Sequence, residues 1–154
     1  MIAHRWPLPE PMRRALAEAA AGARTGAVPV GAVVVCAGAI IAAAHNAPRG
    51  AHDPTAHAEL LAIRAAASAL GSDRLDQCDI WITLEPCAMC AGAIGHARIA
   101  RLYYAASDPK GGAVEHGARL FDLPGALHRP EVYGGIGEAE AAEQLRAFFR
   151  ERRG

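Results

Sequence analysis

Two short motifs constrain this chain more than any other feature of its sequence: His57-Ala-Glu59 and Pro86-Cys87-Ala-Met-Cys90, whose first cysteine is 30 residues after the histidine. Together they offer three side chains of the kinds that bind zinc, and one further carboxylate. A hydrolytic zinc site needs this set, because it has three protein ligands, an open fourth position for water, and a group that moves protons. The fold is therefore expected to bring the two motifs together around one ion.

A structural zinc site and a redox-active dithiol are the alternatives for Cys87 and Cys90. A structural site normally fills all four positions with Cys or His, and no fourth such residue stands at a matching spacing. Thiol redox chemistry would give His57 and Glu59 no role. The joint pattern therefore favours a hydrolytic site over both alternatives.

Composition excludes several classes of protein. With 154 residues, 52% of them hydrophobic, the chain can form one folded domain, which we expect to span residues 1–154. Its formal net charge of zero argues against a DNA-coating protein, so any nucleic-acid contact must come from a local basic patch. No segment approaches the roughly 20 apolar residues of a membrane span, and the first residues lack the apolar run of a signal peptide. We expect a reducing cytoplasm, with Cys87 and Cys90 as metal thiolates. The two other cysteines, Cys36 and Cys78, lie in apolar segments and are expected to be buried.

Hydrophobic periodicity predicts alternating helices and strands. Helices are expected at 10–24, 57–70, 87–97 and 138–153, and strands at 28–36, 39–45, 80–84, 99–105 and 131–133. Ala37-Gly38 predicts a hairpin, and the long later connections predict crossovers. Residues 114–130 are ambiguous, apart from a possible short helix near 118–121. The pattern predicts a three-layer α/β/α domain with a mixed sheet.

Both motifs fall at predicted helix starts, with Thr55 as the expected cap of the first helix. The unpaired N–H groups of a helix N-terminus favour a thiolate, and Cys87 and Cys90 lie on one face of a first turn. Glu59 follows His57 by two residues, an offset of about 200° in a regular helix. Glu59 is therefore expected to act on the metal-activated water as an acid and base, without binding the metal.

The two motifs match the zinc-dependent base deaminases. The likeness extends to other stretches, and there the chain resembles bacterial tRNA-specific adenosine deaminases. These stretches are Val28–Gly31, Asn46, His52–Glu59, Thr83–Ala93, His96–Ile99, Asp108–Ala113 and Leu145–Arg153.

The resemblance implies a cytidine deaminase-like fold, with a five-stranded mixed sheet flanked by helices, and a homodimer with one zinc per subunit. It implies hydrolysis of the wobble adenosine to inosine in a tRNA anticodon stem-loop. Matched residue by residue, His57, Cys87 and Cys90 bind zinc, and Glu59 shuttles protons.

The resemblance also assigns substrate contacts. Asn46 and the Ala58 backbone N–H bind the flipped base, Val30 walls its pocket, and Asp108 and Lys110 lie beside the bound nucleotide. Taken alone, Asn46 and Asp108 also fit ordinary turn residues. An Asn amide, however, can satisfy both the donor and the acceptors of an adenine edge.

The last helix is a candidate RNA-binding surface. Leu145, Phe148 and Phe149 share an apolar face, while Arg146, Arg150 and Arg153 form a separate stripe. The candidate RNA contacts are Phe149, Arg150 and Arg153. The alternative is a core-facing helix with a solvated charged side.

Two positions and one loop depart from the pattern common in the family. Ala27 and Ser107 replace residues that are often charged, and the 122–128 loop has a single His where relatives often have a pair of His upstream. Two other functions remain open. One is a deaminase of a free base such as guanine or cytosine, which has no use for the Arg stripe. The other is a non-catalytic subunit that binds zinc and tRNA, which has no use for Glu59.

Overall fold

The computed structural model describes residues 7–153, and its core is a five-stranded sheet in the order β2-β1-β3-β4-β5. The strands are β1 (Gly31–Cys36), β2 (Ala39–His45), β3 (Cys78–Leu84), β4 (Arg101–Ala106) and β5 (Glu131–Tyr133). Strand β1 runs antiparallel to both β2 and β3, whereas β3, β4 and β5 are parallel. The predicted mixed sheet is confirmed.

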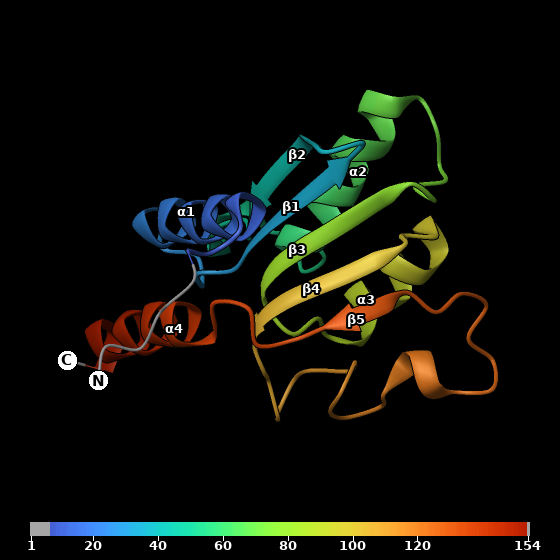
Figure 1. Cartoon of the computed structure of the whole chain (residues 1–154). Helices are drawn as coiled ribbons and strands as arrows, with labels where there is room; N and C mark the ends of the chain where they lie inside the picture. Colours follow the sequence, from blue (N-terminus) through green and yellow to red (C-terminus); the bar gives the residue numbers. More distant parts are fainter. Residues whose placement is uncertain (1–6, 154) are drawn as a thin grey trace.

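Helices cover both faces of this sheet (Figure 1). One face carries α1 (Glu10–Arg24) and α4 (Glu138–Arg153), and the other carries α2 (Ala58–Leu70) and α3 (Ala88–Ala97). Two short 3-10 helices, η1 (Arg49–Ala51) and η2 (Leu120–Asp122), lie in the loops. The predicted three-layer α/β/α fold is confirmed. No helix within residues 7–153 is long and apolar enough to span a membrane.

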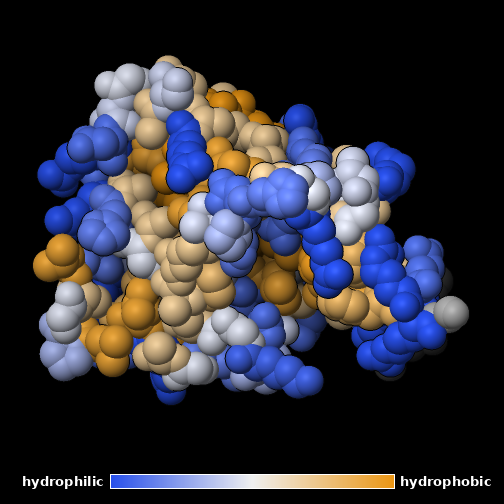
Figure 2. Space-filling model, turned by 180° about the vertical axis from the view of Figure 1, so that it is seen from behind, coloured by the Kyte–Doolittle hydropathy of each residue, from blue (hydrophilic) through white to orange (hydrophobic). Residues whose placement is uncertain are grey.

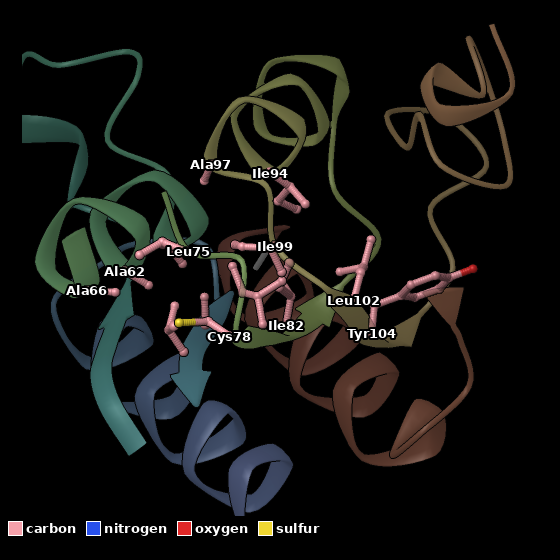
Figure 3. Close-up of a cluster of buried hydrophobic side chains, with 14 of the residues drawn as sticks. Ala62, Ala66, Leu75, Cys78, Ile82, Ile94, Ala97, Ile99, Leu102 and Tyr104 are labelled. Atoms are coloured by element: carbon pink, nitrogen blue, oxygen red, sulfur yellow. The ribbon is translucent and has the colours of Figure 1, made fainter. Parts of the chain in front are cut away.

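The larger hydrophobic core fills the space between the sheet and helices α2 and α3 (Figure 3). Ala62 and Ala66 of α2 and Ile94 of α3 pack against Ile82 and Leu102 of the sheet, and all five are completely buried. Alanine on the inner face of α2 lets this helix lie close to the strands.

A second core lies under α1, around Met12, Ala15 and Val33. Here α1 passes so close to β1 that a methyl group on Gly31 would overlap the carbonyl oxygen of Ala15. Glycine at position 31 therefore fixes the distance between this helix and the strand.

Several boundaries differ from the prediction. Strand β1 begins at Gly31 and not at residue 28, because Pro29 has no N–H and the Val30 N–H bonds to the Val28 carbonyl. In the ambiguous 114–130 segment, the only helix is η2, two residues later than expected. Cys78 is completely buried as predicted, and Cys36, opposite it on β1, is only partly buried.

The residues expected at the site lie together at one end of the strands, where β3 and β4 finish. Strand β3 leads into Cys87, and the parallel strand β4 leads into Asp108. Because β1 runs the opposite way, its first residues lie at this same end. Val30 and Asn46 meet there, where the Asn46 N–H donates to the Val30 carbonyl at 3.2 Å.

Candidate zinc centre and substrate site

The predicted ligands lie at the starts of two neighbouring helices. His57 is the N-cap of α2 and Cys87 the N-cap of α3, each with extended backbone (φ −79° and −72°). Neither side chain makes a capping hydrogen bond, so both are free to turn toward each other. Cys90 adds a third donor from the first turn of α3 and is completely buried.

The distances among these side chains fit a tetrahedral ion. Nδ1 of His57 lies 3.7 Å from Sγ of Cys87 and 3.5 Å from Sγ of Cys90. Zinc bonds of about 2.3 Å to sulfur and about 2.1 Å to nitrogen place tetrahedral ligands about 3.6 Å apart. Among residues 7–153, no other His, Cys, Asp or Glu joins this cluster. The donor set therefore fits zinc with an open fourth position.

Glu59 lies beside this cluster, in the first turn of α2, and is only 4% exposed. Burial raises the pKa of its carboxyl group above the usual value, while its own backbone N–H, Cys90 and His57 act in the opposite direction. The angle of about 200° expected between His57 and Glu59 in a regular helix does not apply, because His57 is the N-cap and lies outside the helix. The carboxylate is next to Cys90 yet outside the ligand cluster, as an acid and base requires.

The Cys90 thiol lies buried in the first turn of α3. Burial raises the pKa of the Cys90 thiol, and the neighbouring Glu59 and Cys87 raise it further. A divalent cation would supply the missing positive charge, so metal binding and loss of the Cys90 proton are coupled.

Asn46 holds the start of α2. The Ala58 N–H donates to Oδ1 of Asn46 at 2.8 Å. Because an N–H must meet an acceptor, this contact identifies the amide oxygen, and the Asn46 NH₂ group is left to donate elsewhere. Ala58 and Asn46 thus bond to each other in this structure. Val30 is 5% exposed and lies directly before β1, next to Asn46.

Asp108 begins a tight turn. Its Oδ1 accepts hydrogen bonds from the Lys110 N–H at 3.2 Å and the Gly111 N–H at 3.0 Å. The carboxylate is therefore a turn former, as the simpler interpretation of the sequence proposed. Its remaining oxygen, Oδ2, and the exposed Lys110 side chain stay available to a ligand.

Glu85 is a site residue that the sequence analysis did not identify. Its side chain is fully buried, and its carboxylate accepts hydrogen bonds from the segment 108–116. The donors are the backbone N–H groups of Asp108, Val114, Glu115 and His116, at 2.9–3.2 Å, and Nδ1 of His116, at 2.8 Å. Burial alone would raise the pKa of Glu85, but these bonds hold the pKa below its usual value. One feature of the sequence could have indicated Glu85: it is a charged residue directly after the apolar strand β3.

The final helix exposes an aromatic ring among cations. Phe148 is buried, whereas Phe149 is 44% exposed. Contrary to the prediction from the sequence, the two rings therefore do not share one buried apolar face. Leu145, Arg146, Phe149, Arg150 and Arg153 line a groove of about 290 Å³. Hydrophilic residues gather over α4 at the right of the rear view (Figure 2). Arg150 pairs with Glu143 at 3.0 Å, and no described residue pairs with Arg153.

Comparison with known proteins decides the family. The family model of MafB19-like deaminases matches residues 9–153. The tRNA-specific adenosine deaminase of Agrobacterium fabrum is 54% identical over 142 residues, which cover 92% of this chain and 93% of the relative. The chain belongs to the tRNA-specific adenosine deaminase family. The resemblance to this family that the sequence motifs indicated is confirmed.

Solved structures agree with this placement of the deaminase. A structure from a study of A-to-I editing by tRNA:A34 deaminases at the wobble position matches with a TM-score of 0.86 at 52% identity, covering 88% of this chain and 98% of that chain. Guanine deaminase from Bacillus subtilis matches with a TM-score of 0.63 at 36% identity, covering 94% and 92%. The deaminase is thus similar to enzymes that act on a base within RNA and on a free base.

Proposed function

We propose that this deaminase converts adenosine to inosine at the wobble position of a tRNA anticodon, with one zinc held by His57, Cys87 and Cys90. The observation that carries the proposal is the combination of 54% identity to a tRNA-specific adenosine deaminase with a buried Glu59 beside a His-Cys-Cys cluster. Glu59 also argues against the non-catalytic subunit, which would need no proton shuttle.

The reaction replaces the exocyclic amino group of adenine with the oxygen of water and releases ammonia. Zinc in such a site lowers the pKa of water in its open position to about 7. Glu59 accepts a proton from the attacking water and delivers one to the departing amino group. A raised pKa suits a group that must both accept and donate near neutral pH.

The remaining residues orient the base. The Asn46 NH₂ group is free to donate to a purine ring nitrogen, because its oxygen is held by Ala58. Val30 supplies an apolar wall at the same end of the strands. Asp108 and Lys110 face the nucleotide and its neighbours, where a carboxylate can accept from a ribose 2′-hydroxyl and so favour RNA.

The assay that tests this function compares substrates. Purified, zinc-loaded protein is incubated with an anticodon stem-loop carrying adenosine at the wobble position and, in parallel, with free guanine, cytosine and adenosine. Inosine in the stem-loop alone supports the proposal. Ammonia from a free base alone would favour the guanine-type function, for which the likeness to guanine deaminase is the supporting observation.

RNA binding is proposed to use Phe149, Arg150 and Arg153 of α4. An exposed ring can stack on a base, and the two guanidinium groups can contact phosphates. The Arg150→Ala/Arg153→Ala variant is expected to bind the stem-loop more weakly and to keep its zinc. If both groups contact phosphate, the slope of log K against log salt should fall in magnitude by about 1.4, at about 0.7 per contact.

A matched control removes two other exposed arginines: Arg74, in the loop before β3, and Arg101, the first residue of β4. This variant has the same net charge as the α4 variant and is expected to keep the original salt slope. Equal affinities for the α4 variant and the unmodified protein would contradict an RNA contact on α4.

We further propose that residues 1–154 act as one zinc-dependent deaminase domain, and that the protein works in the cytoplasm as a homodimer. The family membership supports both. A molar mass in solution of twice the 16.1 kDa of the chain is the expected result for the dimer, and a mass of one chain would contradict it.

A further inference from the structure

Glu85 links the start of α3 to the segment 108–116. It is two residues before Cys87, so it is covalently tied to the start of α3, which carries two of the three metal-binding side chains. Its carboxylate meanwhile holds the segment 108–116, which contains Asp108 and Lys110. No other described carboxylate is bound by so many backbone N–H groups.

The bonds to Glu85 close this segment at both ends. Oε1 accepts from the Asp108 N–H and from Nδ1 of His116. Oε2 accepts from three successive N–H groups, those of Val114, Glu115 and His116. Successive N–H groups that converge in this way form an anion-binding concavity, and here the anion is the protein's own carboxylate.

The backbone of the segment packs closely against Glu85 at Gly112. A methyl group on Gly112 would lie 2.5 Å from Cδ of Glu85 and 2.5 Å from the Asp108 carbonyl oxygen. The Ala113 N–H bonds to the Pro86 carbonyl at 2.9 Å, so the segment is also attached to the residue between Glu85 and Cys87. The turn that presents Asp108 and Lys110 is thus attached to Glu85, and the segment that follows it is attached to Pro86, just before Cys87.

We propose that Glu85 is a positioning residue for substrate recognition, which holds the segment 108–116 against the metal-binding helix so that Asp108 and Lys110 meet the RNA beside the target base. This inference rests on the proposed function. It assigns Glu85 to the binding of the macromolecular substrate and not to the chemical step, because its carboxylate contacts neither the His-Cys-Cys cluster nor Glu59.

The test measures kcat and KM on the anticodon stem-loop for Glu85→Gln. Glutamine keeps the shape of the side chain but turns an NH₂ group toward several N–H donors. Losing such a charge-assisted hydrogen bond is expected to raise KM about tenfold or more. The value of kcat should stay within about threefold, and zinc content should stay at one per chain, because the ligands and Glu59 are untouched.

Two further variants keep the result decisive. Ile80→Val destabilises the core in the same strand, away from the segment, and is expected to lower Tm without changing KM. His116→Ala removes a single, partly exposed donor to Glu85 and is expected to raise KM by a smaller factor. It replaces Glu85→Gln as the deciding variant if the latter fails to fold.

The outcomes separate the inference from the proposed function. Unmodified protein that is inactive on the stem-loop overturns the proposed function. Active unmodified protein together with an unchanged KM in the deciding variant overturns the role of Glu85. A loss of zinc, or a fall in kcat at unchanged KM, also overturns it, because the carboxylate would then support the metal-binding helix alone.

Discussion

Replacement of Glu59 by alanine is expected to abolish deamination of the stem-loop while zinc content and RNA affinity stay unchanged. The carboxylate lies outside the ligand cluster, so its loss leaves His57, Cys87 and Cys90 in place. General acid–base catalysis by one group typically contributes roughly 10²–10⁴-fold, and here the same group would serve both proton transfers. Single-turnover rates at saturating RNA measure the effect on the chemical step directly.

Glu59→Gln is the matched variant, since it keeps the volume of the side chain and removes only its ability to exchange protons. It is expected to be as inactive as Glu59→Ala. Burial raises the pKa of Glu59, so the ionised carboxylate lowers the free energy of unfolding. Glu59→Gln should therefore melt at the same temperature as the unmodified protein or a higher one, whereas Glu59→Ala also loses buried packing. Turnover within tenfold of normal in either variant would contradict the proposed mechanism.

The second large effect is expected at Cys90. Cys90→Ala should lose bound zinc and, with it, all deaminase activity, because two ligands do not hold the ion against a chelator. Bound zinc, measured by elemental analysis after brief dialysis against a weak chelator, should fall from about one per chain to near zero. Adding zinc back should restore activity to chelator-treated unmodified protein and not to this variant.

Cys78→Ala provides the control, since Cys78 is also a completely buried cysteine but lies at the start of β3. Both substitutions remove one buried sulfur, so both lower the melting temperature through the lost packing. Only Cys90→Ala is expected to lose zinc. Full zinc content and activity in Cys90→Ala would show that the cluster is not the metal site.

The sequence predicted which metal-binding side chains lie together better than it predicted their surroundings. Ligand identity depends on residue type and spacing, so His57, Cys87 and Cys90 could be chosen from the motifs alone, and the structure brings the three together. The fold was predictable because its strands and helices have clear hydrophobic periods. The position of Glu59 was harder to predict from the sequence, since it depends on whether His57 belongs to the helix or caps it.

Other features depend on contacts that leave no periodic signal. The segment 114–130 has little regular structure, and part of its backbone is held by Glu85 from a distant strand end. No local pattern shows that a carboxylate at position 85 has its partners near residue 115. Likewise, the helical spacing of Phe148 and Phe149 placed both on one apolar face, but only Phe148 reaches the core.

The most direct test of the account maps the product in a full-length tRNA. An unmodified transcript with adenosine at the wobble position is incubated with the zinc-loaded protein, inosine is located by sequencing, and released ammonia is measured in parallel. The account predicts inosine at the wobble position only, ammonia equal to the inosine formed, and neither product with Glu59→Ala. Inosine at other positions, or ammonia without inosine, would contradict it.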